Sequence, residues 1–334
     1  MPLFWNNLQK PFFVLAPMAD VTDAAFRSII AKYGKPDVFF TEFVSCDGLL
    51  SEGREHLLRD LEYSEKERPI VAQIFGGKPE HFYECAKLIA KLGFDGIDIN
   101  MGCPDRSVEK QGAGAALMKD PKRAREIIAQ CKRGAGDVPV SVKTRIGYNK
   151  NELDGWLPEI LAEDPAAVTV HARTRKEMSK MAAHWEEVAR AVKIRNKMKS
   201  KTLIIGNGEV KNLDDARKKA KESGADGVML GRAVFGNPWL FTQPSHTPTV
   251  EEKLHVMVEH TKLFEKLFGG TPKAPNGARA SKNFATMKKH YKAYVNGFPA
   301  CAGRDGAKEL RIKLMDTKNA FEVESVVAEF LCAK

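Results

Sequence analysis

The chain has 334 residues, of which 43% are hydrophobic and 29% are charged, and its formal net charge is +10. This length suits one large domain with a smaller one, and the composition is that of an ordinary soluble globular protein. No apolar run approaches the ~20 residues of a membrane span and no signal-peptide pattern is present, so we expect a cytoplasmic protein without a membrane partner. We also expect a monomer.

Eight short runs rich in β-branched and aromatic residues alternate with longer amphipathic stretches up to residue 231. The runs lie at residues 12–16, 37–43, 69–75, 95–100, 138–145, 166–172, 202–207 and 226–231. Amphipathic patterns predict helices at residues 78–93, 120–134 and 212–224. Mostly apolar strands, each followed by a helix, predict an α/β fold, a (β/α)8 TIM barrel.

An open doubly wound sheet is the alternative. It is disfavoured because the first strand-to-helix turn, APMADVTD at 16–23, has no G-x-G-x-x-G pattern. Three prolines at 237–250 predict a linker, and only helical periodicity follows it. We therefore expect a barrel domain at residues 1–241 and a small all-α domain at residues 249–334.

The C-terminal ends of barrel strands are where functional side chains gather. The residues there are Pro17, Met18, Gln73, Asn100, Cys103, Lys143, Arg145, His171, Arg173, Asn207, Gly208, Gly231 and Arg232. Glycines after the last two strands favour phosphate binding, although taken alone they can serve only tight turns. Together with Gln73, Lys143 and His171 they predict a ring-shaped anionic cofactor across the barrel mouth.

Cys103 lies between Gly102 and Pro104, so it sits on a sharp turn after a buried strand. The ordinary interpretation of an isolated cysteine is a small buried hydrophobic residue. The six cysteines form no C-x-x-C pair, which argues against zinc and against a disulfide framework, so we expect no metal.

Eight segments resemble the tRNA-dihydrouridine synthases in order and spacing. They are VLAPMADVTDAAFR, TEFVSCDGL, VAQIFG, GIDINMGCPDRSVEKQGAGAALMKDP, VSVKTRIG, VHARTR, IGNGEV and GVMLGRAVFGNPWLF. The resemblance covers about residues 11–241 and continues more loosely through 287–297. The middle of HARTRKEMSKMAAHW (171–185) departs from the family pattern, which bears on tRNA contacts in this loop rather than on the chemistry.

The resemblance implies a barrel that binds FMN and uses NADPH to reduce a uridine in tRNA to 5,6-dihydrouridine. It implies a hydride transfer to C6 and a proton from Cys103 to C5. It also implies FMN contacts with Pro17, Met18, Gln73, Lys143, His171, Asn207, Gly208, Gly231 and Arg232. Substrate contacts would come from Asn100, Arg145 and Arg173.

A thiol suits this reaction because it is mostly protonated at neutral pH and can act as a general acid. The target base must also leave its stack, so the enzyme needs a surface that grips folded RNA. Residues 266–304 contain no acidic residue. We assign Lys288, Lys289 and Lys292 there to tRNA binding, with Phe284, Tyr291 and Tyr294 interleaved, whereas a merely solvated helix face is the alternative.

Two other functions remain open. One is a flavin barrel acting on a small molecule, such as a dihydropyrimidine or dihydroorotate dehydrogenase, and the basic helical domain speaks against it. The other is a non-enzymatic RNA-binding protein, and the combination of Cys103, Lys143 and His171 speaks against that.

Overall fold

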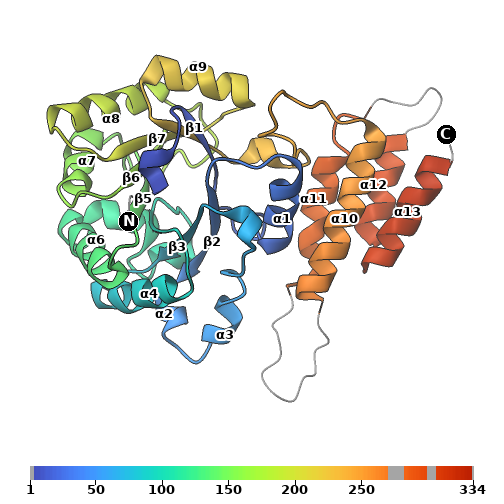
Figure 1. Cartoon of the computed structure of the whole chain (residues 1–334), viewed down its shortest axis with the longest axis horizontal. Helices are drawn as coiled ribbons and strands as arrows, with labels where there is room; N and C mark the ends of the chain where they lie inside the picture. The colour runs from blue at the N-terminus through green and yellow to red at the C-terminus, as the bar shows by residue number, and fades with distance from the viewer. Residues whose placement is uncertain (1–3, 270–281, 299–305, 333–334) are drawn as a thin grey trace. The chain divides into compact units, whose positions relative to one another are not determined.

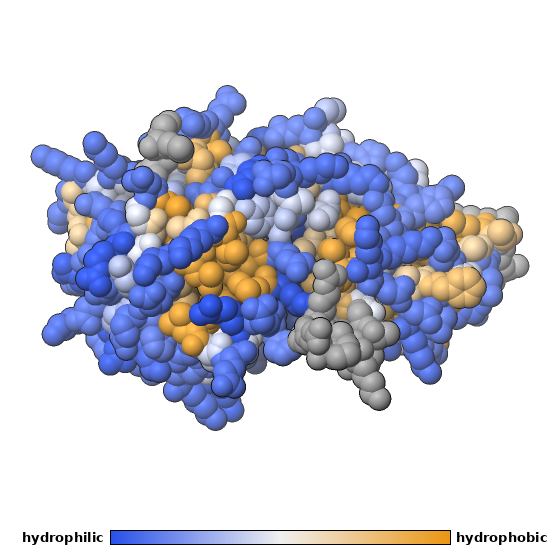
Figure 2. All heavy atoms as spheres, turned by 60° about the horizontal axis from the view of Figure 1, so that its bottom comes forward, coloured by the Kyte–Doolittle hydropathy of each residue, from blue (hydrophilic) through white to orange (hydrophobic). Residues whose placement is uncertain are grey.

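A computed structural model describes residues 4–269, 282–298 and 306–332. They form two compact units, one from residues 4–18 and 36–232 and the other from residues 19–35 and the described residues after 232 (Figure 1). Within the described ranges, no helix combines the length and the hydropathy that crossing a bilayer requires. The face shown in Figure 2 is largely hydrophilic, with hydrophobic residues gathered in a few patches.

The first unit is built on eight parallel strands in the order β1-β8-β7-β6-β5-β4-β3-β2. Their bounds are β1 Phe12–Leu15, β2 Phe39–Ser45, β3 Ile70–Phe75, β4 Gly96–Met101, β5 Val140–Arg145, β6 Ala167–His171, β7 Leu203–Asn207 and β8 Gly227–Leu230. A parallel bridge between Val14 and Val38 links β1 to the start of β2, and the Leu15 amide donates to the Val38 carbonyl at 3.1 Å. The barrel prediction is confirmed, because β1 pairs with β8 on one side and is bridged to the start of β2 on the other, so the sheet closes on itself.

Helices alternate with these strands around the barrel (Figure 1). The longer ones are α4 Pro79–Lys91, α6 Pro121–Ala135, α7 Leu153–Leu161, α8 Trp185–Lys197 and α9 Leu213–Ser223. Shorter ones are α2 Cys46–Leu49, α3 Arg54–Leu57 and α5 Arg106–Glu109, with 3-10 turns at Phe4–Asn7, Glu65–Glu67, Gly114–Lys119 and Arg232–Val234. The three helices predicted from the sequence are confirmed as α4, α6 and α9. Proline starts α4 and α6, where its missing N–H costs nothing.

The barrel interior follows from the two-residue period of a strand. Val71 on β3, Ala167 on β6 and Ile205 on β7 belong to one buried cluster inside the barrel. Because alternate residues of a strand face the same side, Gln73, His171 and Asn207 face the interior further along the same strands. The strands therefore carry an apolar plug at one end and polar groups at the mouth.

The second unit is helical. It contains α1 Ala24–Tyr33, α10 Val250–Phe268, α11 Met287–Tyr294, α12 Gly306–Asp316 and α13 Ala320–Cys332, with a 3-10 turn at Phe284–Thr286. A capping box between Thr249 and Glu252 starts α10. Tyr291 and Tyr294 are fully buried in this core, so they pack the helices rather than offer stacking surfaces for RNA.

The segment after Arg232 differs from the linker expected at residues 237–250. Trp239 is buried in the helical core, and the Thr242 hydroxyl donates to the Tyr33 carbonyl at 2.7 Å. Apolar side chains in this proline-containing stretch therefore anchor it within the second unit. The assignment of residues 1–241 to an FMN-binding catalytic domain and of 249–334 to a tRNA-binding domain stays a prediction.

Candidate active site

Strand register brings the predicted residues of the barrel mouth into neighbouring positions. Gln73 pairs with Asp98 and Asp98 with Ser141, while Asn100 pairs with Lys143. Around the barrel, Arg145 pairs with His171 and His171 with Asn207. Residues that lie far apart in the sequence therefore form one ring of polar groups.

A turn that is fixed by amide hydrogen bonds carries Cys103. The Asn100 Oδ1 accepts from the backbone amides of Gly102 at 3.1 Å and of Cys103 at 2.9 Å. The Asn100 Nδ2 donates to the Gln73 Oε1 at 3.0 Å. Gly114 packs against this turn with a φ of +59°, and a side chain there would lie 2.8 Å from the Cys103 carbonyl oxygen. The turn is therefore held from both sides.

The Cys103 thiol is half-buried beside an apolar cluster of Phe75, Val108 and Ala113. Burial raises the pKa of the thiol, and Asp105 also raises it through its charge, while the Asp105 amide, Arg145 and Lys143 lower it. The thiol is therefore protonated at neutral pH, as a proton donor must be.

Lys143 lies on β5 among polar and charged side chains. Burial and the charge of Arg145 lower the pKa of its ammonium to about 8, against the opposing charges of Asp98 and Cys103. In the described part of the chain the Lys143 ammonium makes no hydrogen bond. A half-buried cation that lacks a hydrogen-bond partner is a candidate for binding an anionic ligand.

Arg145 and Arg173 tie loops to the barrel mouth. The Arg145 Nε donates to the Gly102 carbonyl at 2.8 Å, and its Nη1 donates to the carbonyls of Thr174 and Met178. The Arg173 Nε donates to the Met181 carbonyl at 2.6 Å. Arg145 thus holds both the Cys103 turn and the loop at residues 171–185, whereas Arg173 holds that loop alone. Their predicted contacts with substrate stay predictions.

His171 is neutral and oriented by Arg173. The Arg173 Nη1 lies 3.3 Å from the His171 Nε2, and since a guanidinium only donates, this nitrogen accepts and Nδ1 carries the hydrogen. Burial and the charges of Arg145, Lys143, Arg173 and Arg232 hold the pKa of His171 well below its usual value. The ring therefore offers an N–H donor without a charge.

The ends of β7 and β8 carry the residues for which the sequence predicts a phosphate contact. The Asn207 Nδ2 donates to the Met229 carbonyl at 2.8 Å, which links the two strands. Gly208 has a φ of +126°, where other residues are strained. A side chain on Gly231 would lie 3.5 Å from the Met18 sulfur, and Met18 and Pro17 are half-buried after β1. Arg232 is exposed and makes no hydrogen bond or ion pair with the described residues.

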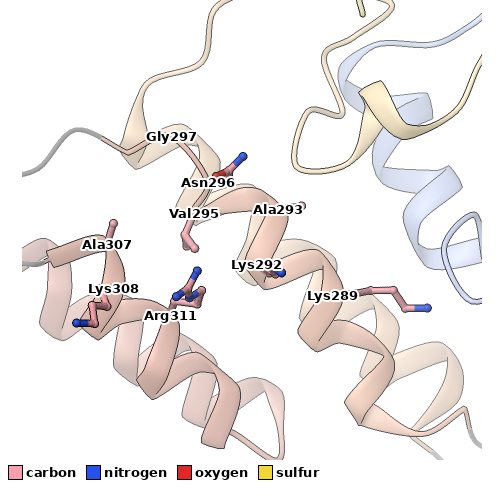
Figure 3. Close-up of a pocket in the computed structure, with 9 residues that line it drawn as sticks. All are labelled: Lys289, Lys292, Ala293, Val295, Asn296, Gly297, Ala307, Lys308 and Arg311. Atoms are coloured by element: carbon pink, nitrogen blue, oxygen red, sulfur yellow. The ribbon is translucent and has the colours of Figure 1, made fainter. Parts of the chain in front are cut away.

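The lysines assigned to RNA lie on α11. Lys289 and Lys292 line a cavity of about 510 Å³, together with Lys308 and Arg311 of α12 (Figure 3). Of the described residues that line it, none is acidic. Lys288 is half-buried and does not line this cavity, so the structure separates it from the other two. Residues 270–281 and 299–304 of the acid-free stretch lie outside the described residues.

Sequence reasoning missed Asp98 and Glu209. Asp98 is fully buried in the barrel and joins Gln73 to Ser141, and Glu209 binds the Arg173 guanidinium at 2.8 Å. The signal for Asp98 was a charged residue inside the apolar strand GIDI. Glu209 gave no such signal, because an acidic residue in a loop is ordinary.

Comparison with known proteins decides the family. A sequence model described as dihydrouridine synthase matches residues 14–330. The chain belongs to the dihydrouridine synthase family. It is therefore an enzyme, an oxidoreductase, and the resemblance found in its motifs is confirmed.

Relatives of this dihydrouridine synthase family member are similar over almost their whole length. A probable tRNA-dihydrouridine synthase of Staphylococcus aureus is 40% identical, with 98% of this chain and 95% of the relative covered. The probable tRNA-dihydrouridine synthase 2 of Bacillus subtilis is 39% identical, with 98% and 96% covered. A structure of histamine dehydrogenase from Rhizobium sp. 4-9 has a TM-score of 0.54 at 14% identity, covering 96% of this chain and 62% of that one, and shows the shared fold.

Proposed function

We propose that this enzyme reduces the 5,6 double bond of a uridine in tRNA, with FMN at the barrel mouth and NADPH as the reductant. The observation that carries the proposal is the half-buried, protonated Cys103 thiol, held on a fixed turn at the mouth near Lys143. Family membership and relatives that are named as probable tRNA-dihydrouridine synthases support it. The cytoplasmic location, the monomeric state and the lack of a metal stay predictions.

The residues of the mouth fit an anionic flavin. Lys143 and Arg232 are cations without hydrogen-bond partners among the described residues, and Gly208 follows β7 with a φ of +126°. The residues that would hold the ring are Pro17, Met18, Gln73, Lys143 and His171. Those that would hold the phosphate are Asn207, Gly208, Gly231 and Arg232. Bound there in its reduced form, the flavin would supply the hydride that C6 of uracil must receive.

Cys103 would complete the reduction. Once C6 has gained a hydride, C5 carries the electron pair and takes the proton of the Cys103 thiol, so that a C–H bond forms and the S–H bond breaks. Solvent then restores the proton to the thiolate. Lys143, while charged, stabilises negative charge at the mouth. The Asn100 side-chain amide is already hydrogen-bonded to Gln73 and to the backbone of the Cys103 turn. Its proposed role toward uracil is therefore indirect, because it seats the base through that turn.

The tRNA backbone would bind the cationic cavity between α11 and α12. Lys289, Lys292 and Arg311 make no ion pair among the described residues, whereas Lys313 on α12 pairs with Glu329 at 3.0 Å. Cations without protein partners are available to phosphates, whose binding releases counterions. Lys288 stays a predicted contact of lesser weight, because it lies outside the cavity.

Two measurements test this function. Purified protein should be yellow and release FMN on denaturation, and Asn207→Ala with Arg232→Ala should lower flavin affinity by about 10–100-fold, the size of a charge-assisted hydrogen bond. Dihydrouridine should disappear from specific tRNA positions in cells that lack the gene and return on complementation. An enzyme that reduces free pyrimidines but leaves tRNA unchanged would establish the small-molecule alternative instead.

A further inference from the structure

Asp98 is a buried carboxylate whose two oxygens are both engaged. It accepts from the Ser141 hydroxyl at 2.6 Å and from the Gln73 Nε2 at 2.7 Å. It is fully buried, and burial raises its pKa to about 6, against the hydrogen bonds and the charge of Lys143. Above that pH the group is ionised and can only accept hydrogen bonds.

This carboxylate sets the orientation of the two side-chain amides that lie between it and Cys103, those of Gln73 and Asn100. Because Asp98 only accepts, the Gln73 nitrogen must face it, and the Gln73 oxygen then faces Asn100. Asn100 must therefore present its nitrogen to Gln73 and its oxygen to the amides of Gly102 and Cys103. A reversed Gln73 would lead to a reversed Asn100, and the Asn100 nitrogen would then face two backbone N–H donors.

We infer that Asp98 is a positioning residue, which orients Gln73 and Asn100 and thereby fixes the turn that carries the Cys103 thiol. The inference rests on the proposed function only in that Cys103 is taken as the proton donor. It differs from a purely electrostatic role, in which Asp98 would act by its charge on Lys143. The two roles predict different behaviour for a leucine and an asparagine at this position.

The test compares Asp98→Leu with Asp98→Asn. Leucine removes the hydrogen-bond acceptor and frees the Gln73 side chain to reverse. The rate of single-turnover reduction of uridine in tRNA should then fall by about 10–100-fold, because small misplacements of reacting groups slow a reaction by this much. Asparagine loses the charge but can point its oxygen to Gln73 and its nitrogen to Ser141, so it should stay within about threefold of the unmodified enzyme. The tRNA concentration for half-saturation should not change in either variant. An equal defect in both would overturn the inference in favour of charge.

A double variant tests whether Asp98 acts through Cys103. In a Cys103→Ala background, Asp98→Leu should cost much less than it does in the unmodified enzyme, because the thiol that it positions is gone. An equal loss of rate in both backgrounds, at equal flavin content, would contradict the inference. Asp226→Asn is the control, since Asp226 is a buried carboxylate just before β8, at the other end of the strands, where it binds Lys10 and Arg195. It should leave the transfer rate unchanged.

Alkylation of Cys103 by iodoacetamide gives a readout that needs no activity. Asp98→Leu should change the alkylation rate of this thiol severalfold and Asp98→Asn should not. Unmodified enzyme that leaves tRNA unreduced would refute the proposed function, whereas equal alkylation in all three proteins would refute the positioning role. Should Asp98→Leu fail to fold, Gln73→Met breaks the next link and should change the alkylation rate in the same way.

Discussion

The barrel mouth and the cavity between α11 and α12 are both polar, but they use their charges in opposite ways. At the mouth most polar side chains are buried and oriented, as Asn100, Arg145 and Arg173 are by hydrogen bonds to other groups. In the cavity, Lys289 and Lys292 are exposed on one helix face without ion pairs among the described residues. The contrast teaches that oriented groups suit chemistry at a fixed atom, whereas exposed cations suit a flexible polyanion.

The largest expected effect lies at the oriented site. Cys103→Ala should bind FMN and accept electrons from NADPH, yet reduce uridine in tRNA about 10²–10⁴-fold more slowly, the usual size of a general-acid contribution. Stopped-flow oxidation of pre-reduced enzyme by tRNA measures this rate. Cys85→Ala, at a buried cysteine of α4, is the matched control. Rates for Cys103→Ala within a few-fold of the unmodified enzyme, at equal flavin content, would show that the proton comes from another group.

Lys143 should give the next largest effect, together with a pH dependence. Its pKa is lowered to about 8, so the charged form prevails below that pH and is lost as the pH rises through it. The reduction rate should therefore decline above pH 8, and Lys143→Met should slow it by about 10²–10³-fold and remove that decline. The profile is measured with pre-reduced enzyme between about pH 6 and 9.5. A variant that keeps the alkaline decline would assign it to another group.

The cavity should show a smaller effect that depends on salt. Lys289→Ala with Lys292→Ala should weaken tRNA binding and flatten the log–log dependence of affinity on salt, by roughly one unit for each phosphate that the variant no longer binds. Lys288→Ala should change tRNA affinity and the salt slope less, because Lys288 does not line the cavity. Lys313→Ala, at a lysine that is already paired with Glu329, serves as the control. An unchanged slope in the double variant would place the RNA-binding surface elsewhere.

The smallest effect on activity is expected in the helical core, where only stability should change. The rings of His260 and His290 are buried and make no hydrogen bonds in the described part of the chain, and burial lowers the pKa of His290 to about 3. Since the unfolded pKa is about 6.5, stability is complete above that pH and falls below it by up to about 1.4 kcal/mol per pH unit for each histidine. Hydrogen exchange of α10 and α11 at about pH 7.5 and 5.5 measures this loss of stability. His290→Leu should make the dependence of stability on pH shallower. Equal pH dependence in both proteins would contradict this.

Local pattern was enough to predict much of the molecule. Apolar strands and amphipathic helices alternate with a period that follows from backbone geometry, so the barrel and its helices α4, α6 and α9 could be placed from sequence. The strand-end rule likewise found Lys143 and His171, because side chains at the ends of parallel strands must meet at one mouth. Tyr291 and Tyr294 are interleaved with basic residues in the sequence, but their side chains are buried in the helical core. Basic neighbours in the sequence do not reveal which face of a helix is buried.

The sequence alone determined the family, the barrel and the group of candidate residues, because these depend on residue type, order and period. Only the tertiary structure decided which partners each side chain contacts. It assigned Arg145 and Arg173 to loop carbonyls, separated Lys288 from the cavity, and placed Asp98 at the start of the amide chain that reaches Cys103. The physical reason is that hydrogen-bond direction depends on partners from neighbouring strands, which lie 25 or more residues away in sequence.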